Sequence, residues 1–335
     1  MLNLMSNSEV YVICPAYNKT GGTELAHQLV FELCNQGVNA NITYYDDNTV
    51  MINPAFTKYV SSFKRIGDIV DIKSNIIIVP EIRQDLLNNY LRIQKCVWWM
   101  SVDNYQKING FKGFYNHFGF WRTLKHTLNG HIHFGGYPLN KDILHLYQSE
   151  YAHQFLVQNK VRNLHKLSDY LNQIYLNSQI NYTKKNNVLY NPKKGIKFTN
   201  KLISSAPELN WIPIQNLSTD EVRKLLLQSK VYIDFGNHPG KDRFPREAAI
   251  SNCCVITGLK GSASFYKDIP ISDEFKFDDT DSNIPVIIKK IKSCLNDYDC
   301  EINKFTVYRE SIRKEYGEFK LDVKDLITNY KNEDN

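Results

Sequence analysis

The sequence predicts an α/β protein with two parallel sheets, and three observations indicate this fold class. Short apolar runs of strand length alternate with amphipathic segments of helix length, which is the pattern of βαβ units. A polar stretch from Asn177 to Asn187 interrupts the alternation, which then restarts. The chain has 335 residues, enough for two domains of roughly 100–200 residues each. We therefore expect domains of 1–178 and 179–335.

The composition is that of an ordinary globular protein. The chain is 42% hydrophobic and 23% charged, which excludes a disordered protein. Its formal net charge of +6 suits anionic ligands or a membrane surface but is too small to indicate a nucleic-acid binder. The apolar runs are far shorter than the ~20 residues that cross a bilayer, and the first residues lack a secretory signal. With an odd number of cysteines, in mostly apolar segments, we expect reduced thiols in a cytoplasmic protein.

The first half is expected to form one sheet with helices between its strands. Strands are predicted at Val10–Cys14, Asn41–Tyr45, Ile76–Val79, Cys96–Met100 and Ile143–Tyr147. Helices are predicted at Thr23–Gln36, Gln84–Gln94 and Glu150–Lys160. Gly21 and Gly22 stand before the first helix, where glycine lets the backbone approach a ligand and helix amides attract an anion.

The second half repeats this alternation. Strands are predicted at Val188–Tyr190, Trp211–Ile214, Val231–Phe235 and Cys254–Thr257, and helices at Ile196–Ser205 and Val307–Tyr330. Ser218 and Glu221 have the spacing of a capping box, and Pro245 suits the first turn of a helix. The loop Asn237–Phe244 therefore joins the end of a strand to the start of a helix, where open α/β sheets bind ligands.

Positive charge gathers in that loop. The loop and the helix start carry four cations, His238, Lys241, Arg243 and Arg246. Cations beside a helix N-terminus predict a diphosphate site, and Glu247 would accept hydrogen bonds from ribose hydroxyls. The alternative is a solvated charged loop, but the nearby Gly236, Pro239 and Gly240 favour a tight, specific one.

Two further loops are donor-site candidates. Lys193 and Lys194 precede the helix Ile196–Ser205 and would reach toward the same phosphates, although lysine pairs are also common on surfaces. Ser262, in the loop Lys260–Ser264, would offer its hydroxyl and backbone amides to a sugar or phosphate, and the alternative there is a plain turn.

Two carboxylates follow strands of the first half. Asp103 comes after Cys96–Met100, and Glu81 follows Ile76–Pro80. Either would deprotonate an acceptor hydroxyl, a contribution of about 10²- to 10⁴-fold, or would instead cap a helix or turn.

A basic, aromatic segment runs from Asn104 to Lys141 without any Asp or Glu. Lysine and arginine beside aromatic rings are typical of surfaces that contact anionic lipids. We expect this segment to dock on a membrane or to hold a lipid-linked acceptor, and the alternative is an ordinary aromatic core. His131 and His133 have no third ligand nearby, so no metal is expected.

Three stretches carry a resemblance to a known family. They are Gly21-Gly-Thr-Glu24, Asn191-Pro-Lys-Lys-Gly195 and Pro245-Arg-Glu-Ala-Ala-Ile-Ser-Asn-Cys-Cys-Val-Ile256. The chain resembles GT-B glycosyltransferases, nearest to the family 4-like group and, within it, to enzymes of bacterial surface-polysaccharide synthesis. The resemblance implies two Rossmann-like domains facing across a cleft, with Glu247 on the donor ribose. A second glutamate of the family is replaced here by Pro239, which leaves retention or inversion open.

The resemblance implies a hexosyl transfer from a nucleoside-diphospho-sugar to a glycan or lipid-linked acceptor. The first domain would bind the acceptor and the second the donor, with the closing helix packing back on the first. His238, Lys194, Lys241 and Arg243 would stabilise the leaving diphosphate, so no cofactor or metal is expected. The rivals are a nucleotide-sugar epimerase of the same fold and a non-catalytic subunit that binds a glycan or a partner. A dinucleotide oxidoreductase fits less well because no Gly-x-Gly-x-x-Gly follows the first strand.

Overall fold

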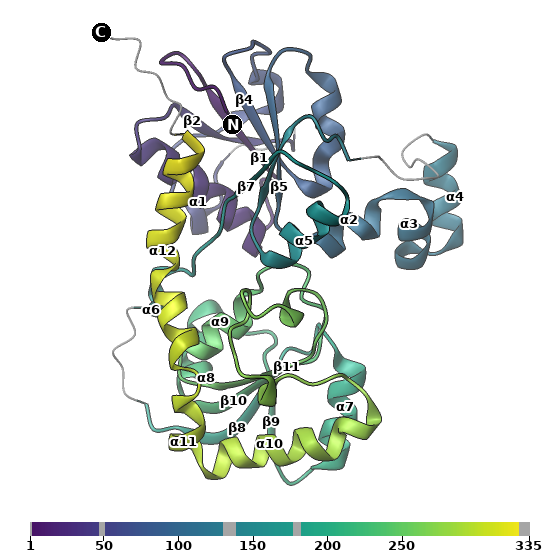
Figure 1. The fold of residues 1–335 in the computed structure, drawn as a ribbon, viewed down its shortest axis with the longest axis vertical. Helices are drawn as coiled ribbons and strands as arrows, with labels where there is room; N and C mark the ends of the chain where they lie inside the picture. The colour runs from purple at the N-terminus through teal and green to yellow at the C-terminus, as the bar shows by residue number, and fades with distance from the viewer. Residues whose placement is uncertain (1, 47–50, 130–138, 177–181, 328–335) are drawn as a thin grey trace. The chain divides into compact units, whose positions relative to one another are not determined.

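The computed structural model describes residues 2–46, 51–129, 139–176 and 182–327. They form two compact units (Figure 1), unit 1 with Met1–Asp169 and Gly317–Asn335 and unit 2 with Tyr170–Tyr316. The chain therefore passes between the units twice, at Asp169–Tyr170 and within the last helix, α12 (Thr306–Ile327). The boundary expected at 178/179 lies outside the described residues.

Unit 1 contains a parallel sheet in the order β3-β2-β1-β4-β5-β6-β7. Its strands are β1 (Val10–Cys14), β2 (Ala40–Tyr44), β3 (Lys64–Arg65), β4 (Ile76–Pro80), β5 (Gln94–Trp99), β6 (Leu144–Tyr147) and β7 (Leu164–Lys166). Every residue of β1 and β4 is buried, as expected for parallel strands covered on both faces. The strands predicted in this half are confirmed, whereas β3 and β7 are too short to leave an apolar pattern.

The helices of unit 1 are α1 (Gly21–Asn35), α2 (Val102–Ile108), α3 (Gly110–Phe118), α4 (Phe120–Leu128) and α5 (Glu150–Gln158), with short 3₁₀ helices η1 (Pro54–Phe56), η2 (Ile66–Asp68) and η3 (Glu81–Asn89). The helix predicted at Gln84–Gln94 is wrong. The chain there is η3, with a non-helical residue at Arg83, and then enters β5. Asp71 prevents a longer helix because its carboxylate accepts hydrogen bonds from the amides of Leu91, Arg92 and Ile93 at 2.8–2.9 Å.

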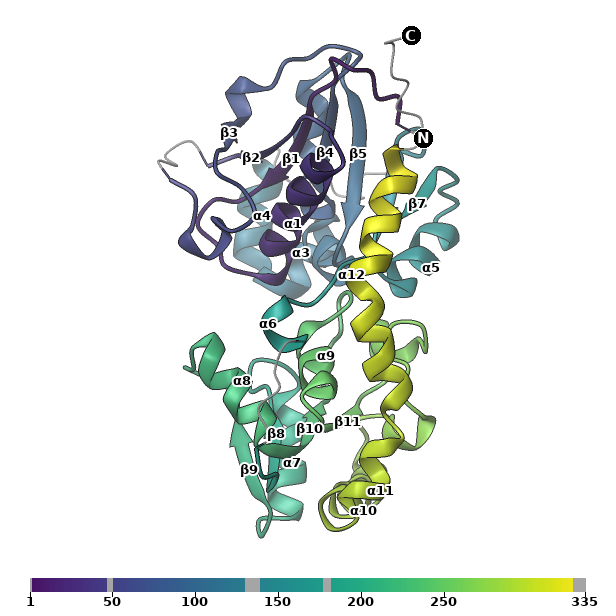
Figure 2. The ribbon, with the colours of Figure 1, turned by 90° about the vertical axis from the view of Figure 1, so that its left-hand side faces the viewer.

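The part of α12 that belongs to unit 1 lies beside α1 and β7 (Figure 2). Gln36 Nε2 donates to the Lys320 carbonyl at 3.1 Å. The Asp322 carboxylate accepts from the amide and the hydroxyl of Ser168, at 2.9 and 2.5 Å. The helix is thus anchored at both sides by polar contacts.

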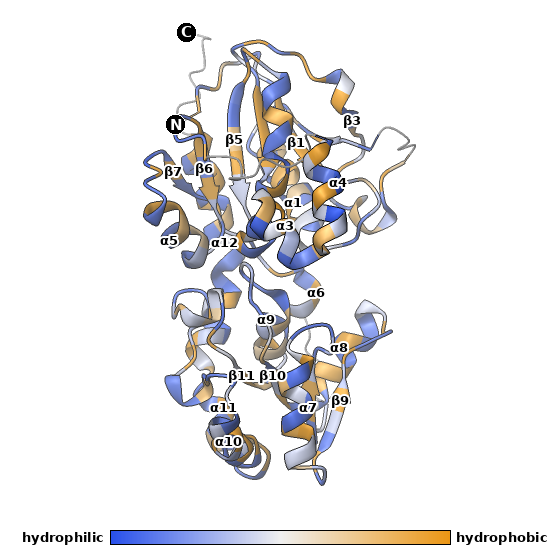
Figure 3. Ribbon diagram, turned by 90° about the vertical axis from the view of Figure 1, so that its right-hand side faces the viewer, coloured by the Kyte–Doolittle hydropathy of each residue, from blue (hydrophilic) through white to orange (hydrophobic). Residues whose placement is uncertain are grey.

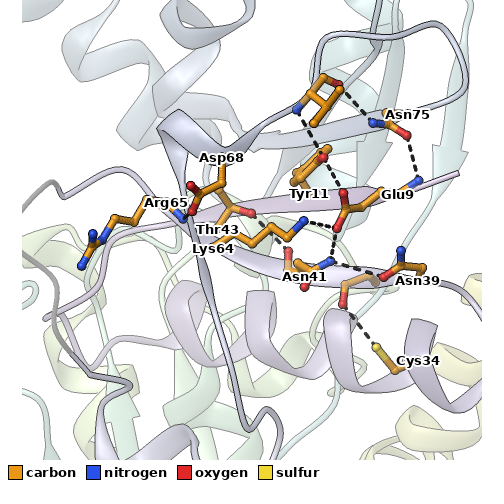
Figure 4. Close-up of polar contacts among 12 residues, drawn as sticks. Glu9, Tyr11, Cys34, Asn39, Asn41, Thr43, Lys64, Arg65, Asp68 and Asn75 are labelled. Carbon is orange, nitrogen blue, oxygen red and sulfur yellow. Dashed lines mark hydrogen bonds and ion pairs between the residues drawn. The ribbon is translucent and has the colours of Figure 1, made fainter.

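A cluster of polar side chains lies at the end of the unit 1 sheet where its strands begin (Figure 4). Glu9 accepts from Tyr11 Oη at 2.5 Å and from Asn41 Nδ2 at 2.7 Å, and it pairs with Lys64. Asn75 accepts from the Glu9 amide at 2.9 Å. These side chains satisfy one another, so the cluster joins β1 to its neighbours.

Unit 2 contains a parallel sheet in the order β11-β10-β8-β9, formed by β8 (Lys185–Tyr190), β9 (Asn210–Pro213), β10 (Ser229–Asp234) and β11 (Cys254–Thr257). Its helices are α6 (Gln173–Leu176), α7 (Ile196–Ser205), α8 (Thr219–Leu227), α9 (Arg243–Ile250), α10 (Ile284–Asn296), α11 (Tyr298–Asn303) and the first part of α12, with η4 (Ser262–Ser264), η5 (Asp273–Phe275) and η6 (Asp281–Asn283). The predicted strands, the helix Ile196–Ser205 and the capping box of Ser218 with Glu221 are confirmed.

All seven cysteines lie in the part of the chain that the structure describes, and all are free thiols, as expected. Among the described helices, none has the length and hydropathy needed to cross a bilayer.

Candidate functional site

Three loops of unit 2 meet where β8, β10 and β11 end. The loops are Asn191–Gly195, Phe235–Asp242 and Gly258–Gly261, and they follow three adjacent strands of the sheet. Ser262, just after the third loop, donates its amide to the His238 carbonyl at 2.9 Å and its hydroxyl to the Gly240 carbonyl at 2.6 Å. The structure therefore brings together the three loops that the sequence singled out, and Ser262 joins two of them.

Glycines permit this close approach. Gly195 has a φ of +60°, and a Cβ there would lie 2.5 Å from the Phe235 carbonyl oxygen. At Gly236 a Cβ would lie 2.4 Å from Lys194 Cβ, and at Gly261, with a φ of +61°, it would lie 2.0 Å from the His238 carbonyl oxygen. Real Cβ atoms do not approach that closely, so the three positions require glycine.

His238 is fully buried between two carboxylates. Its Nδ1 lies 3.0 Å from Asp242 Oδ2, and its Nε2 lies 3.6 Å from Asp234 Oδ1. Burial disfavours the charged imidazolium, but Asp234 and Asp242 outweigh it, so the pKa of His238 is raised. The side chain holds the loop between β10 and α9 in shape.

Lys194 completes this cluster. Its Nζ lies 2.5 Å from Asp242 Oδ2 and so links the loop after β8 to the loop after β10. Burial alone would raise the pKa of Asp242, but His238 and Lys194 reverse the effect and lower it. Lys193, next in the chain, is exposed.

A second charged cluster surrounds Glu315 of α12, which is buried. Glu315 Oε1 lies 3.0 Å from Lys241 Nζ, and its Oε2 accepts from Arg246 at 2.9 Å and from the Leu171 amide at 3.2 Å. Arg246 is only 1% exposed, and it also donates to the carbonyls of Lys241 and Asp242 at 2.9 and 3.2 Å. Arg246 therefore braces the loop from inside.

Glu247 lies one turn into α9 and is buried. The hydroxyl of Tyr175 in α6 donates a hydrogen bond to this carboxylate. Burial raises the pKa of Tyr175, and the negative charge of Glu247 raises it further. Arg243, the first residue of α9, is partly exposed and contributes positive charge near Tyr175.

Two helices begin at these loops. The N-cap residues are Gly195 for α7 and Asp242 for α9, and neither makes a side-chain hydrogen bond to its helix. The first-turn amides therefore keep their capacity to bind an anion, with the positive end of each helix dipole behind them.

The candidates in unit 1 lie at the ends of β1, β4 and β5. Glu81 is buried, its Oε2 accepts from the Met100 amide at 3.1 Å, and burial raises its pKa to about 7. Gly22 lies near Met100, since a Cβ there would be 3.6 Å from the Met100 sulfur. Gly21 and Gly22 form the first turn of α1 rather than a loop before it, with Thr20 as the N-cap.

Asp103 lies in the first turn of α2, where Ser101 is the N-cap. Its Oδ1 accepts a hydrogen bond from Tyr151 Oη at 2.7 Å. Burial raises the pKa of Tyr151, and the carboxylate of Asp103 raises it further. Asp103 thus links α2 to α5 and is bound to a tyrosine rather than open on all sides.

One group of described residues has metal-ligand geometry, Asp234, His238 and Asp242, whose ligand atoms lie within 4.8 Å of one another. The Lys194 ammonium already contacts Asp242, and both ring nitrogens of His238 face carboxylates. The group is therefore a charge cluster closed by its own cations. His131 and His133 lie outside the described residues.

Sequence reasoning missed four residues of the site, Asp234, Asp242, Glu315 and Tyr175. The spacing of Asp234 and Asp242, four residues on either side of His238, was a local signal. Glu315 and Tyr175 come from distant parts of the chain and gave none.

No protein-family model matches the sequence, and no curated protein sequence matches it. Several solved structures are similar in fold. A sucrose-phosphate synthase from Thermosynechococcus elongatus has a TM-score of 0.62 at 12% identity, over 96% of this chain and 98% of that chain. A glycosyltransferase from Rickettsia africae has a TM-score of 0.58 at 14% identity, over 96% and 97%. HepE from Anabaena, in complex with UDP-glucose, has a TM-score of 0.58 at 9% identity, over 96% and 99%. The chain therefore has the fold of GT-B glycosyltransferases, which confirms the predicted fold class.

Proposed function

We propose that the protein is a glycosyltransferase that uses a nucleoside-diphospho-sugar as donor. The observation that carries the proposal is the meeting of three loops and two uncapped helix N-termini where β8, β10 and β11 end. Ligands of open parallel sheets bind at this edge, and first-turn amides favour a diphosphate. The fold similarity to glycosyltransferases, including one solved with UDP-glucose, supports this ligand class.

The donor would be held by groups of different kinds. Arg243 and Lys193 would pair with the diphosphate, whose negative charge grows as the glycosidic bond breaks. Glu247 would accept hydrogen bonds from the ribose hydroxyls. Lys194 and Lys241 would add positive potential, and His238 would keep the loop after β10 in place. This arrangement stabilises the leaving group without a metal ion or a cofactor.

Glu81 would be the general base of the transfer. A carboxylate whose pKa is raised to about 7 accepts a proton from a hydroxyl more readily than an ordinary glutamate does. Asp103, bonded to Tyr151, would orient the acceptor. Gly21 and Gly22 would let the backbone of α1 approach the substrates.

The acceptor would be a glycan or a lipid-linked sugar, in the synthesis of bacterial surface polysaccharide. Three stretches of sequence support this role through their resemblance to enzymes of that type, the regions around Gly21, Lys193 and Glu247. The reaction would take place in the cytoplasm, where nucleotide sugars are made.

Isothermal titration with UDP, GDP, CMP and dTDP tests the donor site. We expect one nucleotide to bind the wild type, and Arg243→Ala and Glu247→Ala to weaken that binding at least tenfold. Lys289→Ala and Glu310→Ala change exposed charges elsewhere in unit 2 and should bind like the wild type. If all four folded variants bind alike, the donor site is misplaced.

A non-catalytic subunit of the same fold is the second candidate. This alternative is favoured because carboxylates of the chain itself already pair with Lys194, Lys241 and His238. The pairing neutralises positive charge that would otherwise attract the donor diphosphate. Such a subunit should bind none of the four nucleotides.

A further inference from the structure

Helices α3 and α4 lie side by side at one flank of unit 1 (Figure 1). Their inner side is packed, since Phe114 is 9% exposed and Thr123 is fully buried. The two helices contain both hydrophobic and hydrophilic residues, as their mixed orange and blue shows (Figure 3).

Large apolar side chains of the two helices are exposed. Trp121 is 79% exposed, Leu128 is 77% exposed and Tyr115 is 45% exposed. Trp121, Lys125 and Leu128 are spaced at i, i+4 and i+7 of α4, so they lie on one helix face. Exposed apolar side chains that gather on one face indicate an interaction surface, whereas isolated ones do not.

The charged residues of α3 and α4 are all basic. Lys112, Arg122 and Lys125 are exposed, and no Asp or Glu occurs from Asn104 to Lys141. We call the six residues Lys112, Tyr115, Trp121, Arg122, Lys125 and Leu128 the α3–α4 face.

We propose that the α3–α4 face docks the protein on an anionic membrane surface. Tryptophan and tyrosine favour the headgroup region of a bilayer, and lysine and arginine are attracted to its negative surface potential. A face with both features lies in the plane of the interface, as amphipathic helices do. A nucleic acid suits it less, because the aliphatic Leu128 offers no stacking surface to a base.

The proposal concerns unit 1 alone and goes beyond the proposed donor chemistry in unit 2. A protein docked in this way would work beside lipid-linked acceptors.

Sedimentation with lipid vesicles tests the proposal. Wild type should pellet with vesicles that contain phosphatidylglycerol and far less with vesicles of pure phosphatidylcholine. High salt should reduce its pelleting with the phosphatidylglycerol vesicles, because salt screens charge. Each basic residue near the surface contributes about fivefold in binding, so Lys112→Gln, Arg122→Gln and Lys125→Gln together should lower binding roughly 100-fold. The matched control is Lys73→Gln, Arg92→Gln and Lys289→Gln, which removes the same charge from other exposed positions.

A second pair of variants tests the apolar contribution. Trp121→Ser with Leu128→Ser should reduce pelleting at least tenfold, whereas Leu91→Ser, at a position 91% exposed on another part of unit 1, should not. Circular dichroism checks that each variant is folded, and nucleotide titration should be unchanged in all of them.

The proposal is overturned if wild type does not pellet with anionic vesicles, or if face and control variants pellet alike. Binding of a single-stranded oligonucleotide that only the face variants lose, without vesicle binding, would overturn it in favour of a nucleic acid. Failure of nucleotide binding with intact vesicle binding would count against the donor site alone.

Discussion

Glu315 is expected to be the residue on which the shape of the donor loop depends most. Its carboxylate contacts Lys241 Nζ at 3.0 Å, accepts from Arg246 at 2.9 Å and accepts from the Leu171 amide at 3.2 Å. Arg246 is 1% exposed, so removing Glu315 takes the carboxylate away from a buried charge. Breaking a buried ion pair by removing one side chain costs about 3–5 kcal/mol.

We therefore predict that Glu315→Ala destabilises the protein by about 3–5 kcal/mol, a fall in melting temperature of roughly 6–20 °C at about 2–4 °C per kcal/mol. Glu318→Ala is the matched control on the same helix, because Glu318 is 50% exposed and its pair with Lys166 is 3.7 Å long. It should change stability by less than about 1 kcal/mol.

A double-mutant cycle isolates the pair itself. In urea unfolding followed by circular dichroism, Glu315→Met and Arg246→Met together should cost less than the sum of the two single changes, by about 1–3 kcal/mol. Additive effects, or equal effects of Glu315→Ala and Glu318→Ala, would refute the reasoning.

Three further predictions concern titration and backbone packing. Burial raises the pKa of Glu81 to about 7 from 4.5, so between these pH values the folded protein binds a proton that the unfolded chain does not. Wild type should therefore lose stability relative to Glu81→Gln as pH rises from about 4.5 to 7. A constant difference in unfolding free energy between the two proteins across that range would contradict the burial. The pKa of His238 is raised, whereas the pKa of His27 is lowered because burial has a larger effect than its polar neighbours. Their imidazole signals in NMR should therefore titrate on opposite sides of pH 6.5, with His238 above and His27 below. Titration in the reverse order would be inconsistent with the contacts of His238 with Asp234 and Asp242. Gly195→Ala should destabilise the protein more than Gly37→Ala in thermal melts, because both have positive φ but only Gly195 faces a backbone oxygen, at 2.5 Å, and equal losses would show that the loops are not in contact.

The longer strands of both sheets could be predicted because each is an apolar run between turn residues, whereas the short β3 and β7 leave no such pattern. β1, β11 and α7 begin and end where the sequence predicts. The three loops of the donor site could also be found, because parallel strands bring their carboxyl ends to one edge and the order β11-β10-β8 makes the three strands neighbours.

What could not be predicted depends on contacts between distant residues. Asp71 prevents the helix expected at Gln84–Gln94 because it accepts hydrogen bonds from three amides near the end of that segment. The local sequence pattern gives no sign of these hydrogen bonds. The pairing of Lys241 with Glu315 joins positions that are far apart in sequence. The loop cations therefore appeared as free ligands in the sequence, whereas the folded chain pairs Lys194, Lys241 and His238 with carboxylates.

Hydrogen exchange with and without the nucleotide that binds in the titration tests most directly whether the three loops of unit 2 hold a nucleoside diphosphate. Mass spectrometry of the saturated protein should show slower amide exchange in peptides that cover 191–198, 236–247 and 258–264, with little change over 284–303. Slower exchange confined to other parts of the chain, with these three segments unchanged, would contradict the account.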